Sequence, residues 1–221
     1  MKLLFVTATN TNIGKTFCSL RIIQHFCEHG LTVGVCKPIE TGITIIDNKN
    51  LIVESGDADA TKLLREVQKY NHNFGSLNPI DITAYTFAIP ASPFSADVDS
   101  IIEIDKIKSK IKELSELCDL LIIEGAGGLL VPITKEYMMI DLAKELNAKI
   151  LLITPSKLGC INDTMLSIEA LKHRDIDFSW CVNLFEDRDE FNKVTKPFYD
   201  EYFDDWWIFD DKVDIINKIL R

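Results

Sequence analysis

The sequence predicts an α/β protein in which a mostly parallel β-sheet is flanked by helices on both faces. Short apolar runs rich in β-branched residues recur along the chain, and each is bounded by polar residues or glycine. This pattern is typical of strands that are buried on both faces. Segments with helical periodicity separate the runs, and strands that alternate with helices form parallel sheets covered by those helices.

The expected strands are residues 3–6, 33–36, 120–123, 150–153 and 180–182, and the expected helices are residues 15–29, 60–69, 104–117, 140–146, 160–173 and 190–202. Residues 71–99 interrupt the alternation and contain three prolines. A connection of that length is usually functional or mobile, and a surface excursion without a role is the alternative. The aromatic residues between positions 199 and 209 are expected to form a last strand on the core, followed by a short final helix.

The composition is that of one ordinary globular domain spanning residues 1–221. Hydrophobic residues make up 47% of the chain and charged residues 26%, which indicates neither disorder nor a fibre. The net charge of -10 argues against sequence-independent nucleic-acid binding, because such binding needs a basic surface. A nucleotide substrate remains open, since backbone N–H groups, a few lysines and Mg²⁺ can hold a triphosphate.

The six cysteines are scattered and include no C-x-x-C pair, so neither a zinc site nor a disulfide framework is expected. Buried thiols in a reducing cytosol are the simplest interpretation, and they predict a cytoplasmic protein. The first six residues contain one cation and a short apolar run, which is typical of a strand rather than a signal peptide. No apolar run approaches the roughly 20 residues that a membrane helix needs.

Residues 7–16 read TATNTNIGKT and lie between the first expected strand and the first expected helix. A phosphate-binding loop takes this position, because backbone N–H groups and the helix dipole can hold phosphates there. Lys15 is expected to reach the β- and γ-phosphates, and the Thr16 hydroxyl is expected to bind Mg²⁺. The strict P-loop pattern has glycine where this chain has Thr9, and a chance Gly-Lys-Thr at a helix start is the alternative.

Two further motifs follow expected strands. Residues 120–128 read LLIIEGAGG, and Glu124 is expected to face the crevice where open α/β sheets bind ligands. Residues 37–42 read KPIETG, and Lys37 is expected at the same crevice, where it can stabilise charge on a transferring phosphoryl group. The alternatives are a simple glycine turn for the first motif and a surface lysine for the second.

Together these motifs resemble the dethiobiotin synthetase family of P-loop NTPases. The family's loop G-T-D-T-x-V-G-K-T corresponds to residues 8–16, its K-P-x-x-[ST]-G to residues 37–42 and its V-E-G-A-G-G to residues 123–128. Its Y-x-F-x-x-P-x-[SA]-P resembles residues 85–93, and KLGCIN at residues 157–162 is associated with this family rather than with NTPases generally. The loop departs from the family pattern in having alanine for glycine and asparagine for aspartate.

The resemblance implies that ATP, CO₂ and 7,8-diaminopelargonate are converted into dethiobiotin, ADP and phosphate through a carbamate that attacks the γ-phosphate. Such chemistry needs positioning and charge neutralisation more than a protein nucleophile. The catalytic lysines would be Lys15 and Lys37. The remaining roles fall on residues that contact metal, nucleotide or substrate.

The implied magnesium contacts are Thr16, Glu124 and an aspartate that opens the second helix. Asp57 and Asp59 compete for the third place, and Asp59 is preferred because it leads most directly into the helical pattern. The implied nucleotide contacts are Asn12, Ile13, Gly14, Lys15, Thr16, Phe17, Glu124 and Asn183. The implied substrate contacts are Thr11, Lys37, Thr41, Gly125, Gly159, Cys160, Ile161 and Asn162.

The resemblance also implies a homodimer, in which residues 159–162 reach the site of the neighbouring subunit. An ordinary helix N-terminus is the alternative for this run. Typical family members enclose the base with a proline-containing loop near their C-terminus, and this chain has only Pro197 after Asn183. Weak discrimination among nucleotide bases is therefore expected, because few polar groups would read the base edge.

Other functions remain open at this stage. A partitioning or iron-protein type of P-loop ATPase is the main alternative, but those proteins carry an extra lysine near the start of the loop, and none lies between Lys2 and Lys15 here. A cobyrinate-type amidotransferase would need a glutaminase domain for which 221 residues leave no room. A nucleotide-gated binding protein without turnover is the alternative outside the enzymes.

Overall fold

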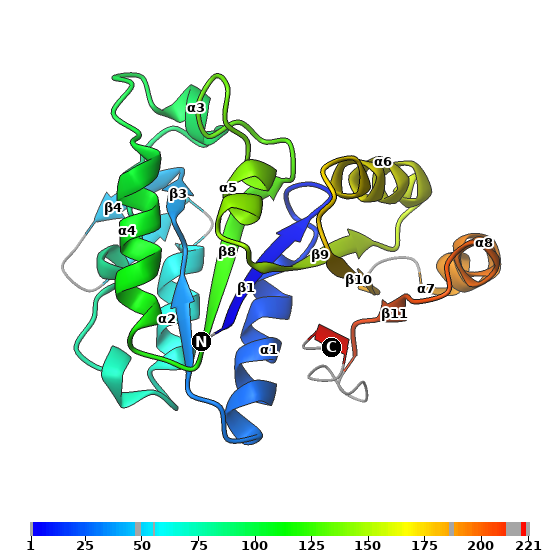
Figure 1. Cartoon of the computed structure of the whole chain (residues 1–221), viewed down its shortest axis with the longest axis horizontal. Coiled ribbons are helices and arrows are strands. Elements are labelled where there is room, and N and C mark those ends of the chain that lie inside the picture. The colour runs from blue at the N-terminus through cyan, green and yellow to red at the C-terminus, as the bar shows by residue number, and fades with distance from the viewer. Residues whose placement is uncertain (1, 47–49, 55, 186–187, 211–217, 220–221) are drawn as a thin grey trace.

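The computed structural model describes residues 2–46, 50–54, 56–185, 188–210 and 218–219. Its centre is a six-stranded sheet in the order β11-β10-β9-β1-β8-β2, and every neighbouring pair of strands in it is parallel. The strands are β1 (Lys2–Ala8), β2 (Val33–Cys36), β8 (Leu120–Gly128), β9 (Lys149–Pro155), β10 (Phe178–Asn183) and β11 (Trp207–Ile208). The first five each contain a run expected as a strand, and β11 lies within the aromatic segment expected to form the last strand. Figure 1 shows their arrangement.

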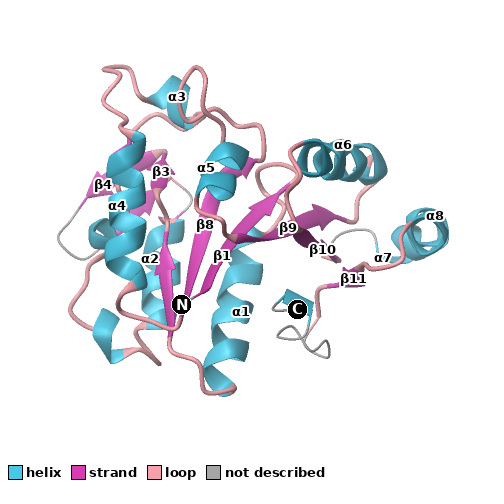
Figure 2. Ribbon diagram, viewed as in Figure 1, coloured by secondary structure: helices cyan, strands magenta, loops and turns pink. Residues whose placement is uncertain are grey.

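The helices lie on both sides of this sheet, as Figure 2 shows, so the predicted fold class is confirmed. They are α1 (Lys15–Glu28), α2 (Asp59–Val67), α3 (Pro93–Ala96), α4 (Ile104–Ser115), α5 (Met139–Glu145), α6 (Cys160–His173), α7 (Arg188–Glu190) and α8 (Lys196–Tyr202). The expected helix 190–202 is interrupted by a π-helical turn, Phe191–Thr195. Pro197 follows in the first turn of α8, where its missing N–H costs no helical hydrogen bond.

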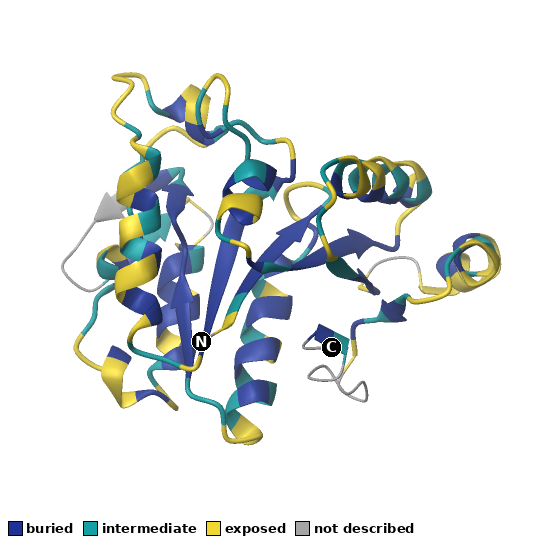
Figure 3. Ribbon diagram, viewed as in Figure 1, coloured by how far each residue is buried: buried dark blue, intermediate teal, exposed yellow. Residues whose placement is uncertain are grey.

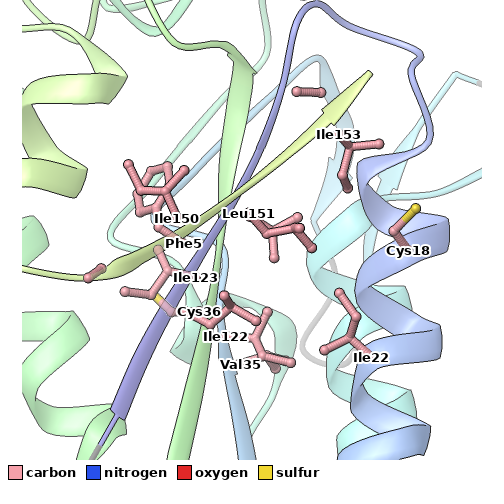
Figure 4. Close-up of a cluster of buried hydrophobic side chains, with 14 of the residues drawn as sticks. Phe5, Cys18, Ile22, Val35, Cys36, Ile122, Ile123, Ile150, Leu151 and Ile153 are labelled. Atoms are coloured by element: carbon pink, nitrogen blue, oxygen red, sulfur yellow. The ribbon is translucent and has the colours of Figure 1, made fainter. Parts of the chain in front are cut away.

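The core lies on both faces of the sheet, because alternate residues of a strand point in opposite directions. Figure 4 shows Leu151 and Ile153 on the side of the sheet where Ile22 of α1 points, whereas Phe5 and Ile150 lie on the other side. All five side chains are fully buried. Figure 3 shows that the exposed residues gather on the outer surfaces of the helices and in the loops. Because helices cover both faces of the sheet, the strands consist of continuous apolar runs.

The stretch at residues 71–99 contains regular structure that the sequence analysis missed. It includes two 3₁₀ helices, His72–Phe74 and Pro79–Ile82, then β7 (Tyr85–Phe87) and α3. β7 pairs in parallel with β3 (Ile39–Thr41), and the backbone N–H of Gly42 donates to the carbonyl of Ile89 at 3.2 Å. The stretch is therefore fastened to the KPIETG segment, which argues against a surface excursion without a role.

A three-stranded antiparallel sheet was also missed. It consists of β4 (Ile43–Ile46), β5 (Leu51–Val53) and β6 (Gly56–Asp57). Strands of two to four residues are too short to display the alternation that identifies a half-buried strand in a sequence.

The aromatic residues near the C-terminus pack as expected. β11 pairs with β10 through Trp207 opposite Cys181, and Tyr199 lies in edge contact with Trp180 at 5.3 Å between ring centroids. Tyr199 belongs to α8 rather than to a strand. The expected final helix lies mostly outside the described residues. Within the described part of the chain, no helix has both the length and the apolar character needed to cross a membrane.

Candidate functional site

The carboxyl ends of β1, β2 and β8 meet at one edge of the sheet because the three strands are parallel neighbours. The loop of residues 9–14 follows β1, Lys37 follows β2, and Glu124 lies in β8 opposite Val6. Glu124 was expected at a strand end, but β8 continues to Gly128, which lies opposite Ala8 after an irregularity in the register. The glycines after Glu124 therefore extend the strand instead of forming a simple turn.

The phosphate-binding loop is shaped by residues with positive φ. Asn12 has a φ of 58° and Gly14, which caps α1, has a φ of 93°. A Cβ atom at Gly14 would lie 2.1 Å from the Nδ2 atom of Asn183, so only glycine fits beside that amide. The same Nδ2 donates a hydrogen bond to the carbonyl of Ile13 at 2.9 Å. Asn183 is thus brought against the loop, and its contact with a nucleotide stays a prediction.

Lys15 is held inside the loop. Its Nζ donates to the carbonyl of Asn10 at 3.1 Å, and the residue is buried. Burial, followed by repulsion from Lys37, lowers the pKa of Lys15 to about 8, because both effects disfavour the ammonium form. A triphosphate beside this ammonium would reverse the shift.

Glu124 is the centre of a buried network. It is fully buried, and its carboxylate accepts hydrogen bonds from Thr16 Oγ1 at 3.0 Å, Ser19 Oγ at 2.8 Å and Lys37 Nζ at 2.8 Å. Lys37 Nζ also lies 3.2 Å from Asp59 Oδ2. The ammonium group of Lys37 therefore sits between the two carboxylates.

The pKa values of this network follow from its charges. Burial alone would lower the pKa of Lys37, but the carboxylates of Glu124 and Asp59 outweigh it and raise that pKa well above its usual range. Burial would likewise raise the pKa of Asp59, and the Lys37 charge lowers it instead. Burial raises the pKa of the nearby Glu40 to about 7, although Lys37 opposes this shift. Lys37 thus stays protonated among these acids.

The structure separates the two competing aspartates. Asp59 opens α2 and faces Lys37, whereas Asp57 lies in β6 and pairs with Arg65. Asp59 is therefore the aspartate that joins the site.

The donor atoms at this site fit a magnesium ion. Thr16 supplies a hydroxyl oxygen, and Asp59 and Glu124 supply carboxylates on either side of the Lys37 ammonium. In the described part of the chain, no group of three or more His, Cys, Asp and Glu side chains is arranged to hold a metal. Mg²⁺ is commonly bound by one or two carboxylates together with substrate phosphates, so this oxygen set suits a metal that arrives with a nucleotide.

A pocket of about 490 Å³ adjoins the loop. Its lining is formed by Thr11, Asn12, Thr41, Pro90, Ala91, Ser92, Pro93, Ala126, Gly127 and Val131. Thr11 and Thr41, both expected to contact substrate, lie in this lining. Gly125 does not line the pocket, but its carbonyl lies 3.4 Å from Lys37 Nζ.

Other expected residues lie apart from this pocket. Phe17 is half exposed on α1, with its ring 6.3 Å from that of Phe209. Residues 159–162 begin α6 and are absent from the pocket lining. Cys160 is buried, its Sγ contacts the Tyr199 hydroxyl at 3.7 Å and its N–H donates to the carbonyl of Lys157 at 3.1 Å, so its side chain has a structural role in this chain.

The sequence analysis missed Ser19, Glu40 and the segment 90–93 as components of the site. Ser19 follows Thr16 by three residues and thus shares its helix face, which is a spacing that could have identified it. Glu40 lies at a variable position of the family motif, so the motif gives no sign of its role. The prolines of the segment 90–93 were noticed but were assigned no role.

Comparisons with known proteins agree with this geometry. A family profile described as an AAA domain matches residues 2–182. An ATP-dependent dethiobiotin synthetase from Sulfurovum sp. (strain NBC37-1) is 53% identical over 207 residues, which cover 94% of each chain. The ATP-dependent dethiobiotin synthetase of Wolinella succinogenes is 34% identical over 100% of this chain and 98% of its own length. That of Helicobacter pylori (strain Shi470) is 36% identical over 89% of this chain and 87% of its own length.

Solved structures with the same fold include partitioning and cell-division proteins. The MinC:MinD cell division protein complex of Aquifex aeolicus gives a TM-score of 0.54 at 14% identity, covering 99% of this chain and 85% of that one. A plasmid partition protein from Borrelia burgdorferi gives 0.56 at 11% identity, covering 99% and 94%. At such low identity the likeness concerns the fold alone.

Proposed function

This chain belongs to the dethiobiotin synthetase family, and from that membership we propose how its residues carry out the reaction. Its activity is the ATP-dependent synthesis of dethiobiotin in biotin biosynthesis, which confirms the resemblance found in the motifs. The partitioning-type alternative shares the fold at no more than 14% identity in the two structures compared, so it is set aside. The observation that carries the residue-level proposal is the meeting of Lys15, Thr16, Lys37, Asp59 and Glu124 beside a pocket.

We propose that the pocket beside Thr11 and Thr41 takes 7,8-diaminopelargonate. One amine of the diamine captures CO₂ as a carbamate, and a carbamate oxygen attacks the γ-phosphorus of ATP while ADP leaves. The second amine then attacks the carbamoyl carbon, phosphate leaves, and the ureido ring closes. The pocket's position next to the phosphate-binding loop supports this order, because the carbamate must lie in line with the γ-phosphate.

The two lysines neutralise the charge that moves during phosphoryl transfer. Lys15 leaves the Asn10 carbonyl for the β- and γ-phosphates, which offer a stronger charge-assisted hydrogen bond. The Lys37 ammonium lies between Glu124 and Asp59, from where we propose that it reaches the carbamate and the transferred phosphoryl group. Removal of a single donor of this kind typically costs several kcal/mol of transition-state stabilisation.

Thr16, Asp59 and Glu124 would hold a magnesium ion in this proposal. The ion would supply neutralisation of the negative charge on the phosphates. Ser19 keeps one carboxylate oxygen of Glu124 in place, and Lys37 balances both carboxylates. The close contact between Gly14 and Asn183 fixes the loop. Phe17, in the first turn of α1 after the loop, is half exposed.

The residues at the start of α6 are assigned to the site of a second copy of the chain. Gly159, with a φ of 90°, turns the chain into α6. The N–H of Cys160 donates to the carbonyl of Lys157 at 3.1 Å, so the N–H groups of Ile161 and Asn162 in the first turn are the ones offered to a ligand. A carboxylate tail of the substrate suits such N–H groups. The whole chain acts as one catalytic domain of a homodimer, and its six free cysteines suit a reducing cytoplasm.

An assay of phosphate release by the purified protein tests this function. Release is expected only when ATP, Mg²⁺, the diamine and bicarbonate are all present, with one phosphate formed for each dethiobiotin. Equal release without the diamine would instead indicate an ATPase of another kind.

A further inference from the structure

The first turn of α2 is capped by a residue that is distant in sequence. Ala58 occupies the N-cap position and offers no side-chain hydrogen bond, although the first N–H groups of a helix need partners. Glu40 of β3 supplies one, because its Oε2 accepts the backbone N–H of Ala60 at 2.8 Å. A carboxylate thus takes the place that serine or aspartate usually holds at an N-cap.

This cap is buried. Ala58 and Ala60 are fully buried and Glu40 is 5% exposed, so water cannot readily replace the carboxylate if it is removed. An unpaired buried N–H would favour a shift or fraying of the helix start. The residue between the two alanines is Asp59, whose side chain faces the site.

Glu40 and Lys37 hold the same helix start at two neighbouring points. Lys37 Nζ lies 3.2 Å from the Asp59 side chain, and Glu40 binds the N–H of the next residue. Both belong to the KPIETG segment, with only two residues between them. Glu40 does not line the pocket beside Thr11 and Thr41, and its hydrogen bond to Ala60 gives it a direct hold on the start of α2.

We propose that Glu40 is a positioning residue, whose carboxylate oxygen fixes the first turn of α2 so that Asp59 stays directed at the magnesium site. This inference rests on the proposed function, in which Asp59 contacts Mg²⁺. The hydrogen-bond acceptor, rather than the charge of Glu40, performs the task. Outer partners that orient a metal ligand typically change metal affinity by about 10- to 100-fold when they are removed.

Three substitutions separate the acceptor from the charge. Glu40→Gln keeps an oxygen at the same reach without the charge, Glu40→Asp keeps the charge but is one methylene too short, and Glu40→Ala keeps neither. The measurement is calorimetric binding of a non-hydrolysable ATP analogue across a range of Mg²⁺ concentrations. The Mg²⁺ requirement is the Mg²⁺ concentration that gives half-maximal binding of the analogue. We expect it to stay within about threefold of the parent value in Glu40→Gln, and to rise about tenfold or more in the Asp and Ala variants.

Two controls complete the experiment. Asp119 accepts the backbone N–H of Thr32 at 3.0 Å at the opposite end of β8, so Asp119→Ala removes an exposed carboxylate-to-backbone hydrogen bond far from the site. Asp59→Asn tests the proposed metal contact directly. If Glu40→Ala does not fold, the Gln and Asp variants decide the question alone.

The outcomes separate the two proposals. The inference is overturned if Glu40→Gln raises the Mg²⁺ requirement as much as Glu40→Asp does. It is also overturned if Asp119→Ala, at the same loss of melting temperature as Glu40→Ala, raises the Mg²⁺ requirement by the same factor. It is overturned alone if Asp59→Asn weakens Mg²⁺ binding and the Glu40 variants do not. If Asp59→Asn leaves the Mg²⁺ requirement unchanged, the metal site of the proposed function falls, and this inference falls with it.

Discussion

At the scale of single residues, the site depends on two lysines in opposite electrostatic surroundings. Lys37 lies 2.8 Å from Glu124 and 3.2 Å from Asp59, which keeps its ammonium charged. Among the residues that the structure describes, no ion pair joins Lys15 to a carboxylate, and burial and the Lys37 charge lower the pKa of Lys15 to about 8. The two lysines therefore respond differently to pH and to substitution.

We predict that Lys15→Ala abolishes dethiobiotin synthesis, because the loop lysine neutralises charge where the γ-phosphoryl group is transferred. Lys37→Ala is expected to be almost as inactive, and also to lower the free energy of unfolding by about 3 kcal/mol, since it leaves Glu124 buried with only its hydroxyl partners. Single-turnover assays and thermal unfolding of both variants measure these effects. Near-normal synthesis by a folded variant would remove that lysine from the mechanism.

We predict that nucleotide affinity falls as the pH rises through about 8. Lys15 is charged below its lowered pKa of about 8 and neutral above it, whereas a bound triphosphate keeps it charged. Between pH 7.5 and 9.5 the Kd of a non-hydrolysable ATP analogue should rise roughly 20-fold, with uptake of about one proton at the higher pH. Calorimetry in two buffers of different ionisation enthalpy measures both quantities, and Lys15→Met should lack the pH dependence.

At the scale of elements, the C-terminal segment completes the sheet and borders the phosphate loop. β11 adds the last strand next to β10, and Phe209 follows it within ring contact of Phe17 on α1. The aromatic side chains of α8 pack on Trp180 of β10 through Tyr199.

We predict weak discrimination among nucleotide bases, because aromatic surfaces offer few polar groups that would be left unpaired by the wrong base. GTP and CTP should support synthesis with a kcat/KM within about tenfold of that for ATP, a difference of roughly 1.4 kcal/mol. Steady-state kinetics with the three nucleotides measures it. A thousandfold preference for ATP would mean that other residues enclose the adenine.

At the scale of the whole molecule, the parallel sheet collects the chemistry at one edge. Lys15 and Lys37 come after β1 and β2, and Glu124 lies within the neighbouring strand β8. The three meet because the carboxyl ends of parallel strands lie side by side. The start of α6, residues 159–162, lies outside the pocket beside Thr11 and Thr41 of the same chain. Leu158 and Leu166, beside and within this helix, are 75% and 60% exposed.

We predict a homodimer that uses this helix and loses activity when it dissociates, because each site would lack residues 159–162 of its partner. Leu166→Glu should yield monomers with at least tenfold lower activity, since a buried unpaired charge opposes association. Ile80→Glu, at another half-exposed apolar position, is the matched control and should remain dimeric. Sedimentation and activity are measured over the same range of concentration, and a fully active monomer would contradict the prediction.

The strands of the central sheet, the position of the phosphate-binding loop and the family could all be predicted from the amino-acid sequence. These features rest on local patterns, namely apolar runs, helical periodicity and short motifs, and such patterns persist whatever the rest of the chain does. Lys15, Thr16, Lys37 and Glu124 could be chosen for that reason. The strands β3 to β7 could not, since they are too short to show a period.

The side chains that surround Lys15, Thr16, Lys37 and Glu124 could be identified only from the three-dimensional structure. Ser19 meets Glu124 across 105 residues of chain and Glu40 reaches Ala60 across 20, and no local pattern specifies a contact at such separations. The choice of Asp59 over Asp57 was made from helix periodicity, but its physical basis is the position of Lys37, which lies 22 residues away in the chain. Short sequence motifs are enough to identify the reactive residues. Their contact partners depend on the packing of the whole sheet, because parallel strands bring distant segments of the chain to one edge.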